Sequence, residues 1–281
     1  MFGPIVPLGG VGGLAFIDRT FERQFELFNK SPQLERDVSY FLENAASFDS
    51  AEALVQDTRA LRVVLGSVGL EDELPKRAFI RKVLEEGTLD PDAFALKLAD
   101  PSWRKLAERV GFGNGFNGFS LENARTQIAA DYRTRQFERA LGDVDVDLRL
   151  ALNFRREVAE ISRDPAVENA GWFRITGSRP LRAVVDLAFG LPEQFGALDL
   201  DLQRTRLEDV ASARYGGKSP AIFTDPEVVE DVIRRFLVRS QAQAGPSADT
   251  PGFTALTILQ ASNGLGGLAQ GNLFASNFGL R

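Results

Sequence analysis

The chain has 281 residues, 44% of them hydrophobic and 26% charged, and its net charge at pH 7 is −6. These values are ordinary for one large or two modest globular domains, exclude a largely disordered chain, and disfavour a nucleic-acid-binding surface. The chain contains no histidine and no cysteine. This composition excludes Ser-His-Asp and Cys-His catalysis, structural zinc sites and haem ligation through histidine or cysteine. An enzyme with this sequence would depend on carboxylates, lysine, tyrosine or a metal held by oxygen ligands.

The N-terminal segment, residues 1–17, carries no charged side chain. A secretory signal needs a basic region before its apolar stretch, and here Pro4, Pro7 and a glycine cluster interrupt the stretch instead. The sequence therefore predicts no cleaved signal, and no run reaches the ~18 apolar residues of a membrane-spanning helix. The glycine cluster at 9–13 lacks the preceding strand and the Lys-Ser or Lys-Thr of a phosphate-binding loop. We interpret the glycine cluster as part of an uncharged, flexible N-terminal arm, residues 1–17. We expect this arm to continue into the helix at residues 21–28 and to pack partly on the body.

The middle of the chain shows the apolar spacing of helices. Phe21, Phe25 and Phe28 recur at helical intervals. The same spacing is found at Leu54, Leu61, Leu65 and Val68. Residues 228–237 carry the widest apolar stripe, with charged side chains on the other face, and place Phe236 in a core. Strand-like patterns are limited to a short pair near residues 172–176. We therefore predict a mostly all-α fold, an irregular multi-helix bundle with glycine-rich, uncharged termini.

Capping signals mark the expected helix ends. An aspartate accepts hydrogen bonds from free N–H groups, and a following proline suits the first helical position, so we expect helices to begin near each Asp-Pro pair. The four pairs stand at residues 90–91, 100–101, 164–165 and 225–226. Thr224 with Glu227 is an alternative capping box at the last of them. The Gly-Leu pairs that begin at Gly69 and Gly190 predict helix ends, because glycine tolerates the left-handed conformation there.

Two segments of the chain share a pattern. Residues 59–70 and 179–191 both read Arg-X-Leu-Arg-X-Val and end in Gly-Leu. This similarity indicates either two related helical halves or a chance recurrence of a helix-ending signal. We divide the chain into an N-terminal arm, a first helical half, a second helical half and a low-charge C-terminal tail. Their bounds are 1–17, 18–113, 114–245 and 246–281.

No motif in the chain predicts a catalytic, cofactor-binding or metal site. Residues 111–119 alternate glycine with phenylalanine or asparagine, but without basic neighbours we interpret them as a linker anchored by its aromatic rings. The alternating aspartates at 143–147 and 199–201 lack the glycine and closing glutamate of a calcium loop, and we interpret them as solvated helix-flanking acids. Glu85 and Glu86 diverge on a helix and do not form the opposed pair of a glycosidase.

The C-terminal segment is the candidate interaction region. Residues 240–281 carry only two charges, Asp249 and Arg281, yet supply apolar side chains that a disordered tail should lack. We expect them to be buried either on the protein's own body or on a neighbouring subunit, and we favour the second because residues 245–247 read as a hinge. The candidate interaction residues are Phe253, Leu256, Ile258, Leu259, Leu265, Leu268, Leu273, Phe274 and Phe278.

The stretch from residue 36 to residue 113 resembles the domain-of-unknown-function 1217 family, which is found in alphaproteobacteria and often encoded in flagellar gene clusters. The matching residues include Arg36-Asp37, Tyr40-Phe41, Asn44, Asp57, Gly69-Leu70, Phe79 to Glu85, Asp90-Pro91 and Phe112-Gly113. A looser likeness continues through Gly190-Leu191-Pro192 and residues 225–237. Thr58 stands where a basic residue is expected, and Ser102-Trp103 stands where a basic residue followed by an aromatic one is expected. The resemblance implies a flagellar association and transfers no catalytic residue.

The residues and the resemblance together leave three functions open. The first is a non-enzymatic structural or assembly protein of the flagellum, exported without a cleaved signal, whose partners are other flagellar proteins or further copies of itself. The second is a cytoplasmic helical chaperone or regulator of flagellar export. The third, more remote, is a carboxylate-based cell-wall hydrolase. We expect no cofactor, no nucleic acid partner and no membrane span.

Overall fold

The computed structural model describes residues 3–98 and 100–244 of the chain. The chain divides into two units, Met1–Val238 and Arg239–Arg281, and both hydrophobic cores lie in the first. The candidate interaction residues between Phe253 and Phe278 lie outside the described residues.

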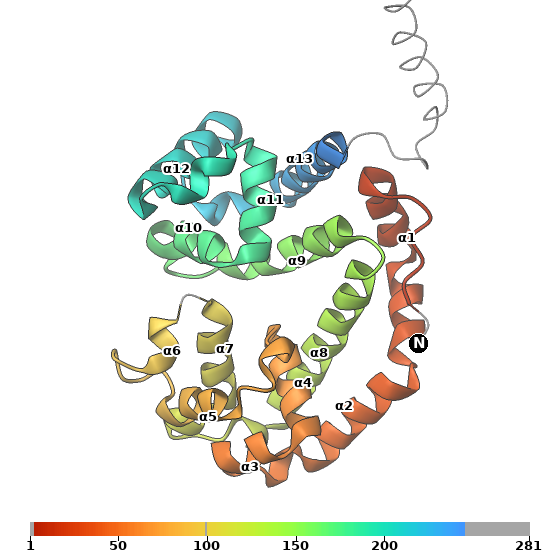
Figure 1. Ribbon diagram of the computed structural model, residues 1–281, viewed down its shortest axis with the longest axis vertical. Coiled ribbons are helices and arrows are strands. Elements are labelled where there is room, and N and C mark those ends of the chain that lie inside the picture. Colours follow the sequence, from red (N-terminus) through yellow and green to blue (C-terminus); the bar gives the residue numbers. More distant parts are fainter. Residues whose placement is uncertain (1–2, 99, 245–281) are drawn as a thin grey trace, which may run out of the picture. The chain divides into compact units, whose positions relative to one another are not determined.

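The described part of the chain is all-α, as predicted, and contains no strand (Figure 1). The first helices are α1 (Gly10–Asn29), α2 (Pro32–Asn44), α3 (Ala51–Gln56), α4 (Thr58–Val68), α5 (Arg77–Glu86), α6 (Phe94–Lys97) and α7 (Pro101–Val110). They are followed by α8 (Glu122–Gly142), α9 (Val146–Ile161), α10 (Val167–Gly177), α11 (Arg179–Phe189), α12 (Leu200–Tyr215) and α13 (Pro226–Ala244). Short 3₁₀ helices stand at η1 (Ala45–Ser47), η2 (Glu71–Glu73), η3 (Phe112–Asn114), η4 (Gly118–Ser120), η5 (Glu193–Ala197) and η6 (Pro220–Thr224). No described helix is long and apolar enough to cross a membrane.

The first hydrophobic core is formed by α2 to α5, α7 and α8 and includes a cluster of phenylalanine rings. Phe137 of α8 is fully buried and meets Phe21, Phe25 and Phe28 of α1 edge-on, with ring centroids 5.3–5.6 Å apart. Edge-to-face pairs add to the stability that burial of the rings supplies. The predicted helical row of phenylalanines is therefore confirmed as the face of α1 that packs on this core.

The second core is formed by α9 to α13 and by the first turns of α1. Phe223 packs edge-on against both Phe154 and Trp172, and Phe236 of α13 is 2% exposed. Burial of Phe236 confirms the apolar stripe of residues 228–237.

Helix α8 contributes to both cores. Phe137 belongs to the first and Leu141, one helical turn later, belongs to the second. The chain then turns through residues 143–145 into α9, so the packing passes from one core to the other at this corner (Figure 1). The division at residue 113 drawn from the sequence stays a prediction.

Two of the four Asp-Pro pairs begin helices as predicted. The carboxylates of Asp100 and Asp225 accept from the backbone N–H of Ser102 (2.8 Å) and Glu227 (2.9 Å), which caps α7 and α13. The capping-box alternative at residue 224 is wrong, because the Thr224 hydroxyl donates to the Ala221 carbonyl instead.

The other two Asp-Pro pairs form turns, and the helices near them begin two or three residues after the proline. The carboxylates of Asp90 and Asp164 accept from the N–H two residues later, at Asp92 (2.8 Å) and Ala166 (2.7 Å). The first α-helical residues, Phe94 and Val167, come later still. Asx turns make the same hydrogen bonds as caps without committing the following residues to a helix.

The glycine stop signals are confirmed. Gly69 (φ 86°) and Gly190 (φ 73°) hold left-handed conformations, and the N–H of the next leucine donates back to Leu65 and Asp186, respectively. This pattern ends α4 and α11.

One sequence prediction about a short apolar segment is corrected and another is refined. The possible strand pair at 172–176 is part of α10, where Trp172 and Ile175 pack into the second core. The helical spacing of Leu54, Leu61, Leu65 and Val68 is confirmed. These residues lie in two helices, because Asp57 ends α3 and caps α4 by accepting from Arg59 and Ala60 N–H. Local spacing cannot distinguish one long helix from two short ones that share a core.

The glycine-rich segments are more ordered than their composition indicates. Residues 10–13 form the first turn of α1, where an added methyl group at Gly13 would lie 2.1 Å from the Leu8 carbonyl oxygen. The expectation of a flexible arm is therefore wrong from residue 10 onward. In the 111–119 segment Phe119 is buried, as a linker anchored by aromatic rings requires, whereas Phe116 is 49% exposed.

Candidate functional site

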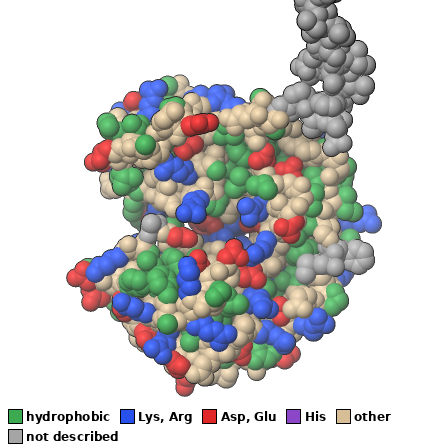
Figure 2. Space-filling model, viewed as in Figure 1, with side chains coloured by type: hydrophobic (Ala, Val, Ile, Leu, Met, Phe, Trp, Pro, Cys, Tyr) green, Lys and Arg blue, Asp and Glu red, His purple; other side chains and the backbone are tan. Residues whose placement is uncertain are grey.

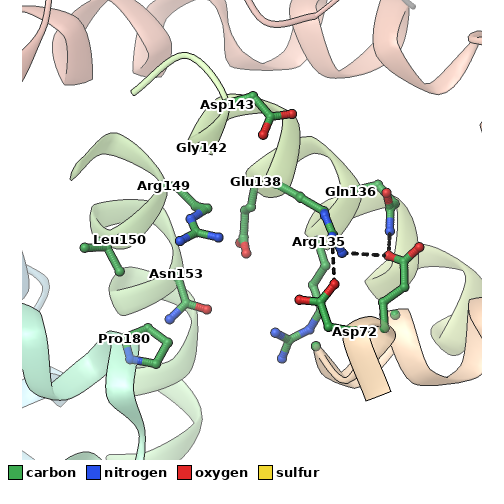
Figure 3. A pocket seen from close by; sticks show the side chains of 14 residues that line it. Asp72, Arg135, Gln136, Glu138, Gly142, Asp143, Arg149, Leu150, Asn153 and Pro180 are labelled. Carbon is green, nitrogen blue, oxygen red and sulfur yellow. Dashed lines mark hydrogen bonds and ion pairs between the residues drawn. The ribbon is translucent and has the colours of Figure 1, made fainter. Parts of the chain in front are cut away.

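A polar cavity of about 460 Å³ lies in the corner between α8 and α9 (Figure 3). Its walls come from the end of α4, from η2, from α8 and α9, and from Pro180 of α11. Basic and acidic side chains are interspersed on this face of the molecule (Figure 2). The lining residues are Gly66, Gly69, Glu71, Asp72, Arg135, Gln136, Glu138, Arg139, Gly142, Asp143, Arg149, Leu150, Asn153 and Pro180.

Four alternating charges join α8 to α9 beneath the cavity. Glu157 Oε1 accepts from Arg135 Nη2 and Arg156 Nη1, both at 2.6 Å. Arg156 also binds Glu138 with two parallel hydrogen bonds of 2.9 Å. All four side chains are less than a quarter exposed. Because a buried charge is tolerated only when it is paired and hydrogen-bonded, this network fixes the two helices in one register.

Burial and the neighbouring charges both shift the pKa values of these groups. Burial alone would raise the pKa of Glu157, but the charges of Arg156 and Arg135 outweigh it and hold this pKa at about 2. Burial and the neighbouring Arg156 both lower the pKa of Arg135. Glu157 is therefore a permanently ionised structural anion at neutral pH and cannot act as a general acid.

A second set of ion pairs forms the wall of the cavity on the side of η2. Arg139 donates to Asp72 (2.7 Å) and to Glu71 (3.3 Å), and Glu71 also accepts from the Gln136 amide. Arg135 adds a hydrogen bond of 3.0 Å from its Nε to the Ser67 carbonyl at the end of α4. These contacts tie α8 to the segment that follows α4.

A second cavity, of about 590 Å³, lies where α1 meets α8 and α9. Arg155 of α9 spans its edge and donates to Asp18 of α1 (2.8 Å) and to Glu230 of α13 (2.7 Å). Burial alone would lower the pKa of Arg155, but the hydrogen bonds to both acids raise it. Both cavities are thus bordered by arginines that bridge separate helices.

The acidic residues singled out in the sequence lie at helix ends or on helix surfaces. Asp145 and Asp199 cap α9 and α12, with the carboxylates accepting from Leu148 and Asp201 N–H. Glu85 pairs with Arg81 and Glu86 accepts from Phe94 N–H, so the two glutamates face different partners. Within the described residues no cluster of three or more acids could hold a metal ion.

Sequence reasoning did not identify the charged corner or Asp186 of α11. The pKa of Asp186 is raised by burial, and its charged neighbour is Arg182, 3.1 Å from Oδ2. The other oxygen of this carboxyl is buried without a hydrogen-bond partner. No local motif marks such residues, since their partners stand in other helices or one turn away.

Comparison with solved structures gives one similar fold. An X-ray crystal structure of protein AGR_C_984 from Agrobacterium tumefaciens is 26% identical, with a TM-score of 0.69 over 87% of this chain and 100% of that chain. The comparison with curated proteins finds no match. The model of the family described as "Protein of unknown function (DUF1217)" matches residues 67–229, which is more than half of the chain. The protein therefore belongs to the DUF1217 family.

Proposed function

We propose that this protein is a non-enzymatic structural or assembly protein of the bacterial flagellum that acts through contacts with other proteins. The flagellar setting comes from the resemblance described above. The mode of action is supported by one feature of the helical body, an exposed apolar surface at the start of α1.

This apolar surface adjoins the corner between α8 and α9. Leu8, Val144 and Val146 are 63%, 53% and 54% exposed. The segments that carry them touch, because a methyl group added at Gly9 would lie 3.3 Å from Asp145 Oδ2. Exposed aliphatic side chains that gather on one surface are typical of protein–protein contacts.

The charged groups of the body favour a binding role over a catalytic one. Glu157 of the corner is held ionised by its two arginines, whereas a catalytic acid needs a pKa near the working pH. Asp186, the half-buried carboxyl with a raised pKa, has an arginine rather than a second acid as its hydrogen-bonded partner. A glycosidase would need two opposed carboxyls.

Localisation tests the proposal most directly. Purified hook-basal bodies and filaments should contain the protein when probed with an antibody against it. Detection in the cytoplasm alone would instead favour the export chaperone or regulator. Peptidoglycan hydrolysis by the purified protein that is lost in the Asp186→Asn variant would contradict both and support the cell-wall hydrolase.

The apolar surface can be tested in the same cells. Val146 is the first residue of α9, where an acidic side chain is favourable, so Val146→Asp should leave the fold stable while placing a charge on the surface. We expect reduced swimming or reduced recovery with flagellar structures. Leu89→Asp, at a 74% exposed position elsewhere, is the matched control and should behave as the unmodified protein.

The C-terminal tail is proposed as a second contact region on the basis of its sequence. Deletion of residues 245–281 should leave the melting temperature of the body unchanged and abolish association or motility. Unchanged self-association, partner recovery and swimming after this deletion would contradict the role of the tail.

A further inference from the structure

We propose that Arg149 and Asn153 of α9 form a binding site for a carboxylate on a short aliphatic stem, such as a glutamate side chain of a partner protein. The site lies in the cavity between α8 and α9, and its recognition chemistry does not depend on the flagellar proposal.

One arginine of this cavity keeps hydrogen-bond donors that no described residue uses. Arg135, Gln136 and Arg139 all donate to acidic or carbonyl oxygens, as described above. Arg149 makes no side-chain hydrogen bond and no ion pair within the described part of the chain, although it lines the same cavity. Its guanidinium keeps five N–H donors in a fork that fits a carboxylate.

Asn153 supplies a second donor one helical turn later. Its Oδ1 accepts from Arg156 Nη2 at 2.8 Å, and this contact orients the side-chain amide. The Nδ2 group then has two N–H donors that no described residue engages. Residues four apart on a helix lie on the same face, so Arg149 and Asn153 both line the cavity between α8 and α9 (Figure 3).

The position of Arg149 depends on a glycine in α8. A methyl group added at Gly142 would lie 2.4 Å from Arg149 Cδ and 2.8 Å from its Nε. The aliphatic stem of Arg149 therefore lies against the bare backbone of the last turn of α8. This contact places the guanidinium at the cavity.

The remaining lining residues restrict the ligand. Leu150 and Pro180 add apolar surface beside the donors, which suits the methylene groups of a short acidic side chain. Asp143, beyond the last turn of α8, is the acid of the cavity rim that forms no ion pair within the described residues. Its charge opposes bulk accumulation of anions, as does the net charge of −6, so an anion is retained only by directed hydrogen bonds.

A fluorescein-labelled peptide that contains three glutamates tests the site by fluorescence anisotropy on the full chain at low salt. The same peptide with three glutamines is the neutral comparison, and glutarate is the small-molecule competitor. We expect saturable binding of the glutamate peptide that is about tenfold tighter than that of the glutamine peptide, because a hydrogen bond to a charged group contributes on this order.

Three variants distinguish hydrogen bonding by Arg149 from nonspecific electrostatic attraction of the peptide. Arg149→Gln should weaken binding about tenfold, whereas Arg139→Gln, which removes the same charge from the same cavity, should change it by less than about twofold because Arg139 is already paired. Gly142→Ala should also weaken binding without any change in charge, since it displaces Arg149 while alanine favours the helix.

The outcomes are decisive in either direction. Equal affinity for both peptides, or equal losses in Arg149→Gln and Arg139→Gln, would overturn the proposal. A lowered melting temperature in Arg149→Gln with no peptide binding would assign this arginine to stabilising the C-terminal end of α8 and would also overturn it. Displacement of the peptide by glutarate at equal concentration would keep the carboxylate site and assign it to small dicarboxylates.

Discussion

At the scale of single residues, Phe236 and Val238 show how burial decides the cost of a substitution within one helix. Phe236 is 2% exposed in the second core, and Val238, two residues later on α13, is 52% exposed. We expect Phe236→Ala to lower the free energy of unfolding by about 3–5 kcal/mol, because the buried ring leaves a cavity. Val238→Ala should change it by less than about 0.5 kcal/mol. Urea unfolding measures both, and similar values for the two variants would contradict the assignment of Phe236 to the core.

Glu157 is the residue on which the charged corner depends. It accepts from Arg135 and Arg156 at 2.6 Å each, so Glu157→Gln leaves two buried guanidinium groups without their shared anion. Loss of one partner from a buried ion pair costs about 3–5 kcal/mol. We expect a loss of unfolding free energy in this range. Glu26→Gln, at an exposed pair with Lys30, is the control and should leave the unfolding free energy unchanged within error.

At the scale of helices, two glycines that end helices separate backbone strain from side-chain crowding. Gly216 (φ 77°) ends α12 with open space around it, and Gly69 (φ 86°) ends α4 with Arg135 Nη1 2.7 Å from the position of an added methyl group. Gly216→Ala should therefore cost about 1 kcal/mol from the left-handed conformation alone.

Gly69→Ala should cost more than Gly216→Ala, because it also moves Arg135 from the Ser67 carbonyl and from Glu157. A chemical-denaturation series on both variants gives the comparison. Equal costs would mean that Arg135 adjusts freely, which would contradict the rigid register between α4, α8 and α9.

At the scale of the whole molecule, the ion network makes stability depend on pH. The pKa of Glu157 is about 2 in the folded protein, below the ordinary value of 4.5. A lowered folded pKa means that the unfolded chain binds a proton first as the pH falls. The stabilisation is therefore complete above about pH 5 and is lost progressively toward pH 2, by about 3 kcal/mol in total.

Urea midpoints measured from pH 7 to pH 3 check this dependence. The fall with acid should be shallower in Glu157→Gln, which has no proton to gain at this position. An equally steep fall in that variant would assign the acid sensitivity to other carboxylates.

The sequence by itself determined the elements that depend on neighbours in the chain. The caps at Asp100 and Asp225 and the stops at Gly69 and Gly190 were predicted because each depends on contacts within a few residues. The all-α class and the burial of Phe236 were predicted in the same way, from the period of the apolar residues. Asp90 and Asp164 show the limit of such signals, since an Asx turn and a helix cap use the same hydrogen bonds locally.

Only the tertiary structure decided which helices pack together and which side chains their contacts bring into one site. The helical state of residues 172–176 follows from packing on a core that residues distant in the chain complete. The charged corner joins Arg135 to Ser67 across 68 positions and to Glu157 across 22. Side-chain partners at such separations carry no shared local pattern, because the free energy that selects them comes from burial and desolvation in the assembled fold.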